Sequence, residues 1–77
     1  MNINLRREEA LHRQSRNLKR IRADLGLTQR EIAERLQITV TTYQRWEHGK
    51  TMLRLRHIAK IISTLHVTPN DLFGISD

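Results

Sequence analysis

Residues 28–50 read TQREIAERLQITVTTYQRWEHGK and decide the fold of this 77-residue chain. A threonine opens each half of the stretch, and a threonine side chain is a favourable N-cap. Thr28 is followed three positions later by Glu31, which completes a capping-box spacing, and Thr39 opens the second half. Gly49 ends the second half, where a left-handed residue suits a helix end. Two short helices joined by so tight a turn predict a helix-turn-helix.

Each half has apolar residues at helical spacing. Those of the first half are Ile32, Ala33 and Leu36, and those of the second half are Tyr43 and Trp46. Because residues at this spacing share one face of a helix, we expect all of them in the core. The two aromatic rings are therefore expected to pack inward and not to stack on bases.

The opposite face of the second helix carries no acidic residue. Its residues, which we expect to point away from the two rings, are Val40, Thr41, Gln44 and Arg45. Asp or Glu in the first turn would stabilise the positive end of the helix. Their absence indicates an end left open for an external anion such as a DNA phosphate. The alternative is a solvated face whose threonines only favour the turn.

The composition allows one domain with a small core. Only 38% of the residues are apolar, with one Phe, one Trp and one Tyr, which leaves room for a partner chain to add stability. The chain has no cysteine, so disulfides and thiolate zinc sites are excluded. No apolar run approaches the ~20 residues that span a bilayer, and no signal peptide is visible. The sequence predicts a soluble, intracellular protein.

The charge distribution favours a polyanion partner. The net charge is +6, and all 14 Lys and Arg residues lie between Arg6 and Lys60. In residues 61–77 the only Asp, Glu, Lys or Arg residues are Asp71 and Asp77. Such a basic surface is typical of nucleic-acid binding. A membrane surface is disfavoured, because the basic segments also carry core-forming residues and no separate apolar face.

The first part of the chain has high helix propensity. Leucines recur every seven residues with an isoleucine between them: Leu11, Leu18, Ile21 and Leu25. They predict one helix from about Leu5 to Leu25, with the last three of these residues buried and Gly26 as its end. In the alternative, Ser15 caps a shorter helix and residues 1–14 form a mobile arm. We divide the chain into an N-terminal extension, 1–15, and a helix-turn-helix domain, 16–77.

The last part predicts two further helices. One runs from about Leu53 or Arg54 to Leu65, and its apolar stripe consists of Leu55, Ile58, Ile61, Ile62 and Leu65. Thr68 and Pro69 start a final short helix that Gly74 ends. The apolar residues there, which complete the core or form a patch between two subunits, are Leu72, Phe73 and Ile75.

The run from Leu18 to Phe73 resembles the phage repressor/Cro-type helix-turn-helix domain, the XRE family. The matching pieces are LKRIRADLGLTQREIAERL, TTYQRWEHGK and HIAKIISTLHVTPNDLF. The resemblance implies an all-α, five-helix, lambda-repressor-like DNA-binding domain that acts as a dimer and places its second motif helix in the major groove. The residues before Arg16 lie outside the resemblance.

The resemblance also implies roles for individual residues. The base-reading positions are Val40, Thr41 and Arg45, with Gln44 as a further candidate at the rim. The positions that contact the DNA backbone are Gln29, Thr39, Lys50 and Arg54. Arg22 and Glu47 match a scaffold ion pair, which we also expect from their places in the two helices. Arg45 suits guanine, Val40 and Thr41 suit a thymine methyl group, and Gln44 suits adenine.

Three residues depart from the pattern of the family. Gln37 and His66 stand where glycine is usual, and Leu53 replaces a common proline. If the first two positions keep a positive φ, each costs about 1 kcal/mol relative to glycine. Because the glycine that is usual at these positions serves a left-handed turn, we expect positive φ at Gln37 and His66.

An enzyme is disfavoured by the residue inventory. There is no cysteine nucleophile, no glycine-rich phosphate loop, and no plausible base for the serines. The histidines lack the i,i+4 spacing of a helical metal site, and we expect each at the surface: His12, His48, His57 and His66. We expect no catalytic residue, metal or cofactor.

The function expected is a sequence-specific regulator of transcription. We expect a phage or bacterial repressor that acts as a homodimer on a palindromic double-stranded operator, in the cytoplasm and at the nucleoid. The main alternative is an antitoxin that also regulates its own promoter and binds a toxin through the N-terminal segment. A third interpretation is a protein-interaction module with the same fold.

Overall fold

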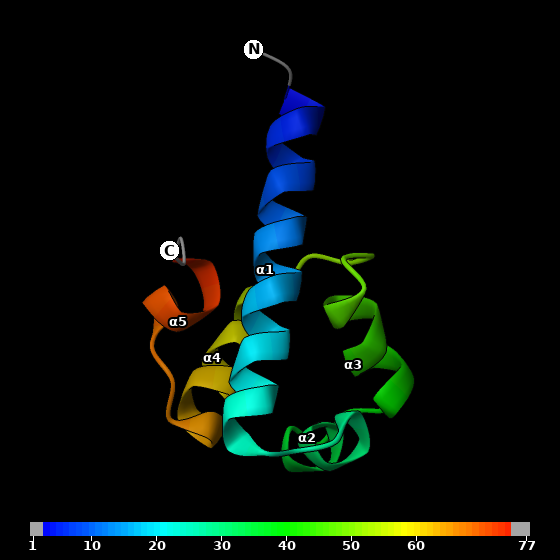
Figure 1. Cartoon of the computed structure of the whole chain (residues 1–77), viewed down its shortest axis with the longest axis vertical. Coiled ribbons are helices and arrows are strands. Elements are labelled where there is room, and N and C mark those ends of the chain that lie inside the picture. The colour runs from blue at the N-terminus through cyan, green and yellow to red at the C-terminus, as the bar shows by residue number, and fades with distance from the viewer. Residues whose placement is uncertain (1–2, 75–77) are drawn as a thin grey trace.

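The computed structural model describes residues 3–74, and over this range all of the regular secondary structure is helical. The helices are α1 (Ile3–Leu25), α2 (Gln29–Arg35), α3 (Val40–Glu47), α4 (Leu55–Leu65) and α5 (Pro69–Phe73). The long α1 forms the axis of the molecule, and its N-terminal part extends beyond the other helices (Figure 1). Figure 1 shows α2 and α3 beside the C-terminal half of α1, with α4 and α5 on its other side. Within the described range no helix is long and apolar enough to cross a membrane.

The first helix is continuous through the point where the sequence left two alternatives. α1 runs from Ile3 to Leu25 without a break at Ser15, so the single long helix is confirmed and the mobile arm is wrong over the described residues. The division at residue 15 falls inside this helix. Gln14 and Ser15 are both buried, so the packed body begins before residue 16.

The helix starts and turns follow local sequence signals. Thr28 forms a complete capping box with Glu31, and Thr68 forms one with Asp71. The Thr39 side chain accepts a hydrogen bond from the Thr42 amide. These caps satisfy backbone donors that have no partner within the helix. All three predicted N-caps are confirmed.

The turns after α2 and α4 contain residues in the left-handed conformation. Gln37 and His66 both have φ +57°, as expected from their places. Gly26 and Gly49 lie in the same region, at +68° and +69°. Glycine adopts this region at little cost, whereas the Cβ of other residues makes it unfavourable.

The apolar core lies where α1 meets the other helices. Its members are Leu18, Ile21, Leu27, Ile32, Ala33, Leu36, Tyr43, Trp46, Leu53, Ile61, Leu65 and Leu72. Two expectations need correction. Leu25 was expected to be buried but is 41% exposed, because it is the last residue of α1 and lines a pocket at the surface. Leu55, at the start of α4, is 80% exposed. α4 begins at Leu55 and not at Leu53 or Arg54, and Leu53 is buried in the preceding connector.

The two apolar residues at the end of α5 differ in burial. Leu72 is completely buried and completes the core, whereas Phe73 remains 37% exposed. Ile75 lies outside the described residues.

Three buried polar side chains of α1 bind the backbone of distant segments. Gln14 Nε2 donates to the Thr51 carbonyl, and Gln14 Oε1 accepts from the Leu53 amide, both at 2.9 Å. Ser15 Oγ donates to the Glu47 carbonyl. In Asn17, Nδ2 donates to the carbonyls of Leu72 (2.7 Å) and Gly74 (3.1 Å). These bonds fix the end of α3, the connector and α5 to α1, because an unsatisfied buried polar group is costly.

The left-handed residue after α4 gives a first test of the fold. We expect His66→Gly to raise the free energy of unfolding by up to about 1 kcal/mol, since glycine relieves the unfavourable φ. Urea denaturation measures the difference. The matched control is His12→Gly, in the exposed middle of α1, where glycine lowers stability by roughly 0.5–1 kcal/mol. A loss of stability in both variants would contradict a left-handed turn at His66.

Candidate nucleic-acid interface

The outer face of α3 is only in part the exposed surface that was expected. Thr41 and Arg45 are exposed, as predicted. Gln44 is half-buried, and Val40 is half-buried and packs against the core. Val40 is therefore shared between the core and the outer surface. Val40 is the first residue of α3 and follows directly on the turn, so its side chain meets the core before the helix presents its outer face.

The inner face of α3 is held by its two aromatic residues. Tyr43 and Trp46 are buried, and their rings meet edge to face with centroids 6.2 Å apart. Such pairs are favourable beyond the area that they bury. The expectation that both rings belong to the core is confirmed.

A buried carboxylate anchors the end of α3. Glu47 is 1% exposed and accepts hydrogen bonds from Arg22 Nε at 2.6 Å and Arg22 Nη2 at 3.2 Å. It also accepts from Gln29 Nε2 at 3.2 Å and from the Tyr43 hydroxyl. Arg22 donates further to the Leu27 carbonyl at 3.0 Å. The expected ion pair is therefore present, and it joins α1, α2 and α3 at one point.

The contacts of this cluster keep Glu47 ionised. Burial raises the pKa of Glu47, but hydrogen bonds from Arg22, Tyr43 and Gln29 outweigh burial, so the pKa is lowered. The hydrogen bond to Glu47 raises the pKa of Arg22. Burial, together with the hydrogen bond to Glu47, raises the pKa of the Tyr43 hydroxyl. The cluster thus holds a carboxylate, a guanidinium and a neutral phenol.

The positions expected to contact the DNA backbone differ in how free their side chains are. Lys50 and Arg54 are exposed, one in the connector after α3 and the other at the N-cap of α4. Thr39 is exposed, but its hydroxyl already bonds Thr42. Gln29 is half-buried and bonds Glu47 and Gln44. The structure thus joins Gln29 directly to Gln44.

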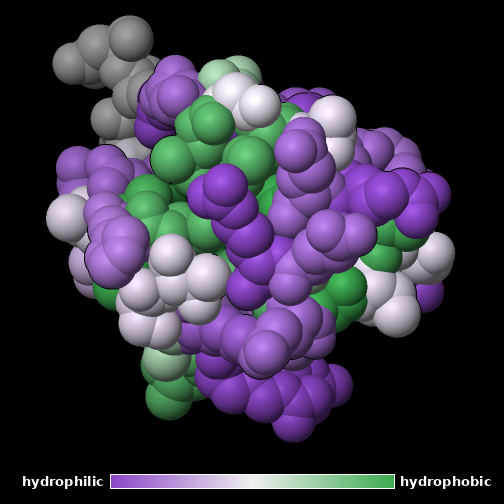
Figure 2. Space-filling view, turned by 90° about the horizontal axis from the view of Figure 1, so that it is seen from below, coloured by the Kyte–Doolittle hydropathy of each residue, from purple (hydrophilic) through white to green (hydrophobic). Residues whose placement is uncertain are grey.

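The surface at the α2 end of the molecule is mainly hydrophilic. Seen from that end, hydrophilic side chains cover most of the view, and apolar side chains gather in one area that hydrophilic ones partly cross (Figure 2).

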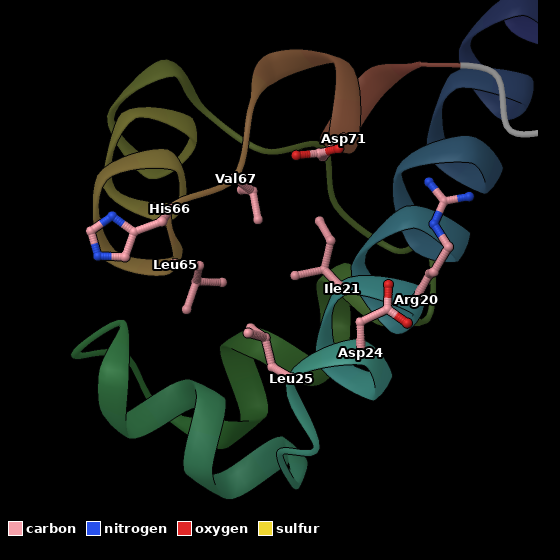
Figure 3. A pocket seen from close by; sticks show the side chains of 8 residues that line it. All are labelled: Arg20, Ile21, Asp24, Leu25, Leu65, His66, Val67 and Asp71. Carbon is pink, nitrogen blue, oxygen red and sulfur yellow. The ribbon is translucent and has the colours of Figure 1, made fainter.

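A pocket of mixed polar and apolar lining lies between the C-terminal ends of α1 and α4. It has a volume of about 250 Å³ and is lined by Arg20, Ile21, Asp24, Leu25, Leu65, His66, Val67 and Asp71. The four apolar side chains point toward one another, while His66 points away from them (Figure 3). The sequence did not indicate this pocket, because its walls come from segments that lie far apart in the chain.

One histidine departs from the expected surface placement. His12, His48 and His66 are exposed, but His57 is half-buried, with its ring 5.0 Å from that of Trp46. Its Nδ1 atom is buried and has no hydrogen-bond partner within the described residues. Burial, together with the charges of Arg56, Arg54 and Lys60, lowers the pKa of His57. The sequence did hold one indication of this burial: His57 lies four residues before the buried Ile61, on the same face of the helix.

The ion pair gives a test of how the scaffold holds α3. We expect Arg22→Met to lower the free energy of unfolding at pH 7 by roughly 3 kcal/mol, because Glu47 remains buried without its charged partner. In the wild-type protein the pKa of Glu47 is lowered from its ordinary 4.5. Its stabilising contribution is therefore full above pH 4.5 and is lost as the pH falls through the lower folded value. Urea denaturation at several pH values measures both effects.

In Arg22→Met a proton can neutralise Glu47, so the difference from wild type should narrow below pH 4.5. The control is Lys19→Met on the same helix, where the side chain is exposed. This change should cost less than about 1 kcal/mol. Equal losses in both variants, or a loss that is independent of pH, would contradict a structural role for the pair.

The comparisons with known proteins agree with this geometry. Residues 18–72 match the family model described as helix-turn-helix. The match begins within α1 and contains α2, α3 and α4 completely. Searches of curated proteins and of solved structures found no match. Because the match covers most of the chain, the protein belongs to the helix-turn-helix family of the Cro and repressor (XRE) type, a family of DNA-binding regulators of transcription.

Proposed function

We propose that this protein is a repressor of phage or bacterial type that binds a palindromic double-stranded operator as a homodimer. The observation that carries the proposal is the outer face of α3, where Thr41 and Arg45 are exposed and no acidic residue lies in the first turn. That face is fixed from behind by the buried Glu47 cluster. A rigid helix with an acid-free start is suited to the major groove.

The two exposed residues of α3 would read bases directly, and the half-buried Gln44 is a further candidate. Arg45 has a planar guanidinium that can give two parallel hydrogen bonds to guanine O6 and N7. Thr41 offers a methyl group for thymine and a hydroxyl that can donate to or accept from a base edge. Val40 is half-buried, so we assign it a smaller contact at the rim. Lys50 and Arg54 would hold phosphates and set the register without reading sequence.

The dimer would form through the apolar residues near α5. Phe73 is one of the large apolar residues that the described structure leaves exposed. The last part of the chain carries no Lys or Arg, so two copies can approach there without strong repulsion. A two-fold dimer implies half-sites about one helical turn apart.

One observation supports an antitoxin as a second candidate. The family match begins at residue 18, whereas α1 begins at Ile3 and extends past the other helices (Figure 1). A protein partner would have access to this part of α1. Co-purification with a small toxic protein through residues 3–13 would favour the antitoxin over a dedicated repressor. Both candidates place the protein in the bacterial cytoplasm, at the nucleoid.

The direct test of the proposed function is selection of bound duplexes from a random library, with the mass of the complex measured alongside. The expected result is a two-fold symmetric sequence bound by two chains, with affinity that falls steeply as salt rises. Absence of duplex binding at low salt would contradict the proposal. An asymmetric site bound by one chain would contradict the dimer alone.

Two substitutions separate base reading from phosphate binding. Arg45→Ala should cost about 1–3 kcal/mol on the selected operator and relax the preference at one base pair. Lys50→Ala should weaken binding to all duplexes alike and lower the slope of log affinity against log salt by about one unit. Fluorescence anisotropy with the operator and its single-base variants measures both. The same profile for both variants would refute the assignment.

A further inference from the structure

A chain of hydrogen bonds leads from the buried carboxylate to the outer side of α3. Gln29, the first residue of α2, donates from Nε2 to Glu47 Oε1 at 3.2 Å. Gln44 of α3 then donates from Nε2 to Gln29 Oε1 at 3.1 Å. Both glutamines are half-buried, so their amides are neither free in solvent nor closed off from a ligand.

The direction of this chain is fixed by donor and acceptor chemistry. An ionised carboxylate can only accept hydrogen bonds, and Glu47 already receives those of Arg22 and Tyr43. Gln29 must therefore turn its amino group to Glu47, which leaves its carbonyl oxygen facing Gln44. Gln44 can satisfy that oxygen only with its own amino group. Each amide in the chain consequently has one permitted orientation.

We propose that Gln29 is a positioning residue that sets the base preference of the protein through Gln44. The inference rests on the proposed function, in which α3 reads the major groove. With one N–H bonded to Gln29, Gln44 keeps its Oε1 acceptor and one N–H for a base. This combination fits adenine, which presents the N6 amino group and N7, and it accepts the N4 amino group of cytosine less completely. Without Gln29 the amide can turn over and accept other bases.

The second N–H of Gln29 takes no part in the hydrogen bonds from Glu47 to Gln44, and it can donate to a phosphate oxygen. Gln29 would then contact the DNA backbone and orient a base reader at the same time. That arrangement would couple the register on the duplex to the reading of one base pair.

The experiment measures base preference on the full-length protein, with duplexes that vary each position of the selected operator. The base pair read by Gln44 is the one whose preference disappears in Gln44→Ala. We expect the wild-type preference there to be for adenine, on the order of tenfold. Gln29→Ala should lose most of this adenine preference. The double variant Gln29→Ala/Gln44→Ala should lose no more of the preference than Gln44→Ala alone. The matched control is Gln37→Ala, since Gln37 bonds Lys60 and not α3; it should keep the wild-type profile.

A second variant reverses the orientation. Gln29→Lys keeps a donor for Glu47 and so keeps the cluster intact, but it offers Gln44 no acceptor. Gln44 should then turn its carbonyl inward and its amino group outward, which moves the preference to guanine or thymine. Thermal unfolding confirms that each variant is folded.

Retention of the adenine preference in both Gln29 variants, or an unchanged profile in Gln44→Ala, would overturn the inference. These outcomes leave the proposed function standing, because the wild-type protein still binds its operator. Failure of the wild-type protein to bind any duplex would instead refute the proposed function.

Discussion

The carboxylate of Glu47 is the point on which the placement of α3 depends. It is almost completely buried and receives hydrogen bonds from α1, from the start of α2 and from within α3. Moving a charge from water into the protein interior is costly, and several well-placed hydrogen-bond donors are needed to offset that cost. A geometry that satisfies them all is therefore strongly preferred over small rotations of α3. The same carboxylate dictates the orientation of the Gln29 amide, so one group links the stability of the scaffold to the outer face of the helix.

Features that depend on neighbouring residues could be predicted from the sequence. The caps at Thr28, Thr39 and Thr68 depend on a side chain and an amide three residues later, and the structure contains all of them. The left-handed turns at Gln37 and His66 followed from the family resemblance, in which glycine is usual at both positions. The family match supports the class of function on the same stretch.

Features that depend on distant segments could not be predicted in this way. Gln14 and Asn17 are polar residues with no burial signal in the sequence, yet both are buried and bind the backbone of distant segments. Periodicity correctly identified the inner face of each helix, but it did not show which residues at a helix end remain uncovered by the neighbouring helices. Leu25 was therefore wrongly placed in the core. His57 was missed for the opposite reason, because its contact with Trp46 covers a residue type that is usually exposed.

The most direct test of the central claim is an NMR titration of the isotope-labelled full-length chain with the selected duplex. The claim is that the outer face of α3, held by the Glu47 cluster, is the surface that meets DNA. It predicts that the largest amide shift changes fall on residues 39–45 and at the start of α2, with small changes around the pocket between α1 and α4. Largest changes on α5 or around that pocket, with α3 unaffected, would contradict it.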